Sequence, residues 1–106
     1  MLTKEQEQYV IQEAMRVFGS QLQFDMLSEE CGELLSAMNK YRRGRISALD
    51  LIEEIVDVQI ICEQILHLVD TDKKATHKMR QAKLERLRTR LLNSGKANMQ
   101  LLFPMD

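Results

Sequence analysis

The chain has few residues that interrupt helices. Its 106 residues include only four glycines and a single proline, Pro104, near the C-terminus. Proline inside a helix removes a hydrogen bond and clashes with the preceding turn, so its scarcity leaves almost the whole chain free to be helical. No segment alternates apolar and polar residues as a half-buried strand does. These absences predict an all-α fold, and the length predicts a single domain with a limited core.

Features of secreted and membrane proteins are also absent. The N-terminal sequence Met-Leu-Thr-Lys-Glu-Gln-Glu lacks the apolar region of a signal peptide, and no apolar run is long enough to span a bilayer. The two cysteines, Cys31 and Cys62, lack metal-ligand spacing and fall at expected core positions. We interpret them as buried free thiols. The chain is therefore predicted to be cytoplasmic and to make no membrane contact.

Four helices are predicted from apolar periodicity and from residues typical of helix ends. The first runs from about residue 4 to Phe18 and ends at Gly19. Ser20 is expected to cap a second helix of about 22 residues, with Gln23 in capping-box position and Gly44 as its stop signal. The predicted apolar side of the first helix consists of Tyr9, Val10, Ala14, Val17 and Phe18.

The third helix is the most apolar. Ser47 is expected to cap it, with Asp50 three residues later, and isoleucine, leucine and valine surround its axis almost completely. A helix that is apolar on all sides must be buried on all sides, which in so small a domain predicts a subunit interface. Thr71 or Asp72 is expected to cap a fourth helix that runs to about Asn93. We expect the domain to cover residues 1–95 and residues 96–106 to form a C-terminal tail.

Two acidic motifs with the same spacing lie in the second and third predicted helices. Glu29-Glu30-x-x-Glu33 is followed by Glu53-Glu54-x-x-Asp57, each within an otherwise apolar pattern. Because each helical residue advances by about 100°, Glu30 and Glu33 lie about 60° apart on a face that also carries apolar residues. Glu54 and Asp57 repeat this geometry. The carboxylates are therefore predicted to face inward.

Inward carboxylates would repel one another and lose hydration unless a cation neutralised them. Oxygen ligands suit Mg²⁺, with Mn²⁺ as an alternative, and Mg²⁺ commonly adds substrate phosphates to a few protein carboxylates. The two motifs thus predict a metal site. The competing interpretation places these glutamates on the solvated flanks of ordinary helices.

Basic residues gather on the fourth predicted helix, where Leu84, Leu87 and Leu91 form an apolar stripe. Residues 73 to 90 carry Lys73, Lys74, Lys78, Arg80, Lys83, Arg86, Arg88 and Arg90. For most of them solvation is the simpler role, and no specific nucleic-acid partner is expected. At the end of the second helix, Lys40 suits the helix dipole and could also face an anion.

The two acidic motifs resemble a known pattern. Glu-Glu-Cys-Gly-Glu-Leu followed by Glu-Glu-Ile-Val-Asp-Val resembles the EExxE and ExxD motifs of the MazG-like, all-α nucleoside triphosphate pyrophosphohydrolases. The likeness extends to Phe-Gly-x-x-x-Gln, Lys-Tyr-Arg-Arg-Gly-Arg and Lys-Leu-Glu-Arg-Leu, which look like the short, single-domain members. It covers roughly residues 15 to 92.

This resemblance implies a four-helix, bundle-like domain that forms a homodimer or homotetramer through its central helices. It assigns Mg²⁺ binding to Glu30, Glu33, Glu54 and Asp57, with Glu29 as a further catalytic acidic residue. The implied reaction cleaves a nucleoside or deoxynucleoside triphosphate to the monophosphate and pyrophosphate, which suits house-cleaning of the nucleotide pool.

Substrate contacts follow less directly from the resemblance. Lys83 and Arg86 would meet the substrate phosphates, and Lys40 is a further candidate. Some relatives stack the base on tryptophan, which this chain lacks. Phe18, Phe24 or Tyr41 would have to substitute.

Two other interpretations use the same residues. A di-iron carboxylate bundle needs Glu-x-x-His on two helices, and neither His67 nor His77 supplies it. A non-enzymatic helical interaction module would explain the apolar third helix but not the two inward acidic pairs. Divalent-metal binding by the purified protein would separate the module from the enzyme.

Overall fold

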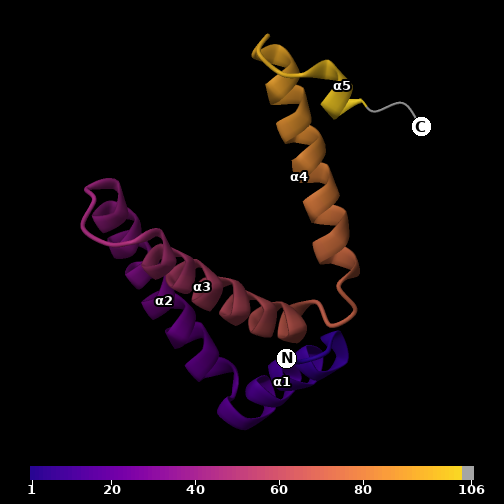
Figure 1. Ribbon diagram of the computed structural model, residues 1–106. Coiled ribbons are helices and arrows are strands. Elements are labelled where there is room, and N and C mark those ends of the chain that lie inside the picture. Colours follow the sequence, from indigo (N-terminus) through magenta and orange to yellow (C-terminus); the bar gives the residue numbers. More distant parts are fainter. Residues whose placement is uncertain (104–106) are drawn as a thin grey trace. The chain divides into compact units, whose positions relative to one another are not determined.

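The computed structural model describes residues 1–103, which are helical apart from short connections. The helices are α1 (Lys4–Phe18), α2 (Ser20–Arg42), α3 (Ala48–Val69), α4 (Lys74–Asn93) and α5 (Met99–Leu102) (Figure 1). No strand occurs in this part of the chain. The all-α prediction is confirmed, and the four long helices end within about two residues of their predicted limits.

The chain divides into two compact units between Asp72 and Lys73. The first unit contains α1, α2 and α3. The second contains α4 and the single turn α5, which lies in the predicted tail. The sequence predicted one domain over residues 1–95, which would include parts of both units. This assignment stays a prediction.

Gly19 forms the junction between α1 and α2. Its φ of 81° lies in the left-handed region, which glycine adopts without steric cost, and its N–H donates to Met15 O at 3.0 Å. The same residue precedes the first residue of α2, so Ser20 is already helical. The predicted Ser20 capping box is therefore wrong, because glycine geometry rather than a side-chain cap starts α2.

The α2–α3 connection positions the two acidic motifs opposite each other. Gly44, at φ 72°, turns the chain after α2. The Asp50 N–H donates to Ser47 Oγ at 3.2 Å, and the Ser47 N–H donates to Asp50 Oδ2 at 3.1 Å. This reciprocal pair satisfies two N–H groups at the start of α3 and confirms the predicted capping box.

The start of α4 differs from the prediction by one or two residues. Lys73 precedes the first helical residue and adopts φ 64°, which is uncommon outside glycine. The Thr71 hydroxyl instead donates to His67 O, at the end of α3, at 3.1 Å. Neither Thr71 nor Asp72 is thus the residue from which α4 starts.

The core of the first unit is small. α2 and α3 lie side by side and α1 packs against both (Figure 1). The buried apolar residues are Ile11, Met15, Ala37 and Ile61. On α1, the predicted apolar side is wrong: Tyr9, Val10, Val17 and Phe18 are exposed, because the face that packs against α2 and α3 is that of Ile11 and Met15.

Burial is also lower than predicted elsewhere. Cys31 is exposed and Cys62 only half-buried, so the interpretation as buried thiols is wrong for Cys31, although both cysteines are free. Within the first unit only α1 and α2 pack against α3, and Ile52, Val56 and Ile60 remain 40–50% exposed. Burial of α3 on all sides is therefore not achieved within the first unit.

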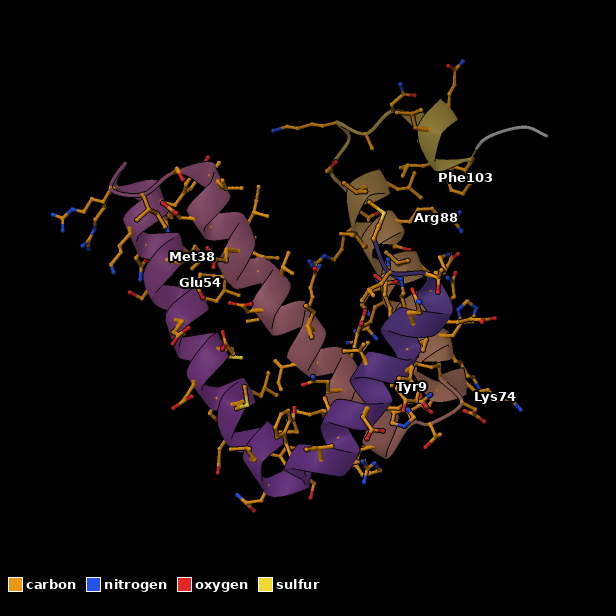
Figure 2. The ribbon with its side chains drawn as sticks, turned by 60° about the horizontal axis from the view of Figure 1, so that its bottom comes forward. Tyr9, Met38, Glu54, Lys74, Arg88 and Phe103 are labelled. Atoms are coloured by element: carbon orange, nitrogen blue, oxygen red, sulfur yellow. The ribbon has the colours of Figure 1, made fainter. Side chains whose placement is uncertain are left out.

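In the second unit, α5 contacts α4 through Arg88. The guanidinium lies 4.8 Å from the centre of the Phe103 ring, and its Nη1 donates to Leu102 O at 3.3 Å (Figure 2). Leu84, Leu87 and Leu91 are each more than 40% exposed, so the predicted stripe has no partner within this unit. Among the helices of residues 1–103, none combines the length and apolar character needed to cross a membrane.

Candidate metal centre

Three carboxylates from the two acidic motifs meet between α2 and α3. Glu30 and Glu33 come from successive turns of α2. Glu54 comes from α3 and lies toward α2 (Figure 2). One carboxylate oxygen of each lies within 4.8 Å of the others. No other group of three or more such ligands is found within residues 1–103. The predicted convergence of the two motifs thus occurs for these three residues. The predicted inward position is wrong for Glu33, which is exposed, whereas Glu30 and Glu54 are half-buried.

Two of these carboxylates carry oxygen atoms that lack a partner. Glu30 Oε2 and Glu54 Oε2 are inaccessible to solvent and accept no hydrogen bond within the described part of the chain. A buried acceptor without a partner is unfavourable, more so when it is charged. A cation coordinated by oxygen would satisfy both atoms, so the residues present fit a hard divalent metal.

The electrostatics of the cluster favour protonation. Burial raises the pKa of Glu30 above its ordinary value, and the charges of Glu33, Asp57, Glu54 and Glu29 raise it further. Burial also raises the pKa of Glu54, and the charges of Glu33, Asp57 and Glu53 raise it further. Both carboxyls therefore hold their protons more strongly than exposed ones, and a bound cation would displace those protons.

The remaining motif residues lie beside the cluster. Asp57 is half-buried on α3, and its charge acts on Glu30 and Glu54, although it is not among the three converging ligands. Glu29 is exposed and acts on Glu30. The structure thus joins three of the four predicted ligands most closely and leaves Asp57 as a near neighbour.

A pocket of about 340 Å³ adjoins the cluster and shares Glu33 and Glu54 with it. Lys40 lines this pocket, so one predicted substrate contact lies next to the carboxylates. The remaining lining residues are Ser36, Ala37, Ile46, Asp50 and Glu53.

Lys83 and Arg86 belong to α4 in the second unit, where both are exposed. Their predicted contact with substrate phosphates stays a prediction. Sequence reasoning did not single out Ser36, although it follows Glu33 by three residues and so shares its helical face. It also treated Gln23 only as a cap, whereas this side chain is 1% exposed and its Oε1 has no partner within residues 1–103.

Comparison with known proteins gives no identification: no family model, curated protein or solved structure matches this chain. The candidate metal centre is therefore interpreted from its own chemistry and from the motif resemblance.

Proposed function

We propose that this chain is a Mg²⁺-dependent nucleoside triphosphate pyrophosphohydrolase of the MazG-like type. The observation that carries the proposal is the convergence of Glu30, Glu33 and Glu54, two of which hold buried oxygen atoms without a partner. The resemblance of both acidic motifs to that family supplies the reaction class, in which water cleaves the triphosphate to a monophosphate and pyrophosphate.

The carboxylates divide into ligands and their neighbours. Glu30, Glu33 and Glu54 would hold the metal, with Asp57 as a fourth ligand supplied by α3. Mg²⁺ or Mn²⁺, when bound, supplies positive charge against the phosphates and lowers the pKa of a coordinated water. The converged carboxylates hold that charge at a fixed place beside the pocket, so a substrate that enters the pocket lies next to it.

Glu53 is the best candidate to accept a proton from the attacking water. It is exposed and lines the pocket next to Glu54. Asp50 lines the same pocket, but its Oδ2 already accepts the Ser47 N–H in the capping box. Glu29 is exposed but does not line the pocket. A general base must lie within hydrogen-bond reach of the proton it removes, which favours Glu53.

A screen of nucleotides tests the proposal. Purified protein is incubated with canonical and damaged nucleoside and deoxynucleoside triphosphates in Mg²⁺ or Mn²⁺, and released pyrophosphate is measured. We expect release from at least one of them and none in EDTA. No release from any nucleotide with either metal would overturn the proposal and favour the interaction module.

The assembly belongs to the same proposal. Ile52, Val56 and Ile60 lie on α3 at 40–50% exposure, which is unfavourable for large aliphatic side chains that face water together. We propose that a second copy covers them in a homodimer or homotetramer. Light scattering should then give two or four times the chain mass of 12.4 kDa. A monomer at micromolar concentration would contradict this.

The main alternative is a non-enzymatic helical interaction module, which the same exposed apolar face favours. It requires no metal, so divalent cations should then leave the melting temperature unchanged. The two free cysteines suit a reducing cytoplasm under either proposal.

A further inference from the structure

The pocket beside the metal centre extends toward one end of the α2–α3 pair. Glu33, Ser36 and Lys40 follow one another along its α2 wall, and about 10 Å of helix separates Glu33 from Lys40 at 1.5 Å per residue. Toward the other end, Gln23 and Ile61 are packed at 1% and 3% exposure. A ligand held at Glu33 and Glu54 therefore has room on the Lys40 side and meets packed core on the other.

Lys40 is uncommitted within this pocket. It is the basic side chain among the lining residues, yet its ammonium makes no ion pair within residues 1–103, although Glu33 and Glu53 line the same pocket. The Arg16 and Arg88 guanidiniums, by contrast, each pair with a glutamate on their own helix. The Lys40 charge is thus available to an anion that enters the pocket.

Ser36 is uncommitted as well. Its hydroxyl makes no hydrogen bond within the described chain, whereas the Ser28 hydroxyl, two turns earlier on α2, donates to Phe24 O at 3.4 Å. A helical serine normally has this backbone carbonyl available as an acceptor. The Ser36 hydroxyl can therefore donate to a ligand without breaking a bond within the fold.

We propose that Lys40 and Ser36 bind the two phosphate groups that leave as pyrophosphate, which orients the substrate with its β and γ phosphates toward Lys40. This subsite rests on the proposed function and defines the direction in which the triphosphate lies. A lysine ammonium binds phosphate as a point charge, and a serine hydroxyl donates to a phosphate oxygen. No aromatic residue is among the lining residues of the described pocket, so it lacks the stacking surface that a base would use.

Calorimetric titration with the magnesium complex of inorganic pyrophosphate tests the subsite. Lys40→Ala should weaken binding roughly tenfold and Ser36→Ala by a smaller factor, since the first removes a charged contact and the second a neutral one. Two control substitutions on α2 should leave binding unchanged. Arg42→Ala removes a cation from the same helical turn as Lys40 without touching the pocket, and Ser28→Ala removes the hydroxyl bonded to Phe24 O.

A second titration, with magnesium and a nucleoside monophosphate, tests the direction in which the triphosphate lies in the pocket. Lys40→Ala and Ser36→Ala should leave monophosphate affinity within about twofold of the parent, because the monophosphate lacks the β and γ phosphates. Weaker monophosphate binding with unchanged pyrophosphate binding would reverse the orientation and overturn the inference. Equal effects of the pocket and control variants, or no binding of pyrophosphate by the parent, would overturn it too.

The results of these titrations distinguish a failure of the phosphate subsite from a failure of the proposed function. Binding of Mg²⁺ alone should be as tight or tighter in Lys40→Ala, because a nearby positive charge is removed. A parent that binds pyrophosphate through Lys40 and Ser36 but hydrolyses no nucleoside triphosphate would refute the proposed reaction and leave the phosphate subsite. If the parent hydrolyses a nucleoside triphosphate but all variants bind pyrophosphate with the same affinity as the parent, the subsite alone is refuted.

Discussion

The two units of this chain use helices of similar length in different ways. In the first unit, α2 and α3 pack against each other and bring carboxylates together in partly buried positions. In the second, α4 buries none of its residues, and its cations apart from Arg88 are exposed. Residues 1–72 hold fourteen acidic and six basic side chains, whereas residues 73–106 hold two acidic and nine basic ones.

This difference shows where charge matters for the fold. Like charges that remain hydrated on an exposed helix repel weakly, because water screens them. Like charges that packing holds within 4.8 Å, where two of the oxygen atoms are out of reach of water, repel more strongly. We therefore expect substitutions of the cluster to have large effects and substitutions on α4 to have small ones.

The largest effect is expected on activity. Glu54→Gln and Glu33→Gln should each lower pyrophosphate release by a factor of roughly 100 or more, because each removes a charged metal ligand. Glu63→Gln provides a matched control, since Glu63 is exposed on α3 away from the cluster. Initial rates at saturating Mg²⁺ make the comparison. Equal rates in all three variants would place the metal elsewhere.

The next effect is on thermal stability, and it has opposite signs with and without metal. In EDTA, Glu33→Gln and Glu54→Gln should melt at least as high as the parent, because one repelling charge has been removed. Added millimolar Mg²⁺ should raise the melting temperature of the parent by several degrees and that of the variants by less, since a ligand that binds only the folded state stabilises it. Equal metal shifts in all three proteins would mean that Glu33 and Glu54 do not bind the metal.

The dependence of stability on pH follows from the raised pKa values of Glu30 and Glu54. A carboxyl whose pKa is higher in the folded state favours folding at low pH, and this contribution is lost as the pH rises through the folded pKa. For the metal-free protein the loss should begin near the ordinary value of 4.5 and continue as the pH rises through the raised pKa values.

Denaturant titrations in EDTA between pH 4.5 and 7.5 measure this dependence. The difference in unfolding free energy between Glu30→Gln/Glu54→Gln and the parent should grow in favour of the variant as the pH rises. Saturating Mg²⁺ should reverse the trend for the parent, because the metal competes with protons for the same oxygen atoms. A constant difference across the range would mean that these carboxyls titrate as exposed ones do.

The helices themselves follow from the sequence to a large extent. Signals at helix ends act over a few residues. The ends of α1 and α2 at Gly19 and Gly44, and the capping box of Ser47 and Asp50, could therefore be predicted without a structure. The spacing of Glu30 and Glu33 also predicted correctly that they meet Glu54, although Glu33 is exposed and does not face inward. Where a local signal was misread, as at Ser20, a competing one at the neighbouring residue determined the boundary.

Burial could not be predicted to the same extent, because it depends on which face finds a partner. Apolar periodicity on α1 does not distinguish the face of Ile11 and Met15 from that of Val10 and Val17, and only packing against α2 and α3 decides between them. The same limit explains why Cys31 is exposed. The pocket lies between two helices and a loop, so residues such as Ser36 enter the site only through the tertiary arrangement.

The smallest expected effect lies in the second unit, at the contact between α4 and α5. Arg88 stacks on Phe103, donates to Leu102 O and pairs with Glu85, but its surroundings are largely exposed. Such contacts contribute about 1 kcal/mol together. Arg88→Ala should therefore accelerate amide hydrogen exchange in residues 99–103 by roughly fivefold and leave α2 and α3 unchanged.

Arg90→Ala is the matched control, because Arg90 is exposed on the same helix and makes no ion pair within residues 1–103. Equal exchange in both variants would mean that the Arg88 contacts do not hold α5. An exchange change that extended into α2 and α3 would mean that the two units unfold as one cooperative unit.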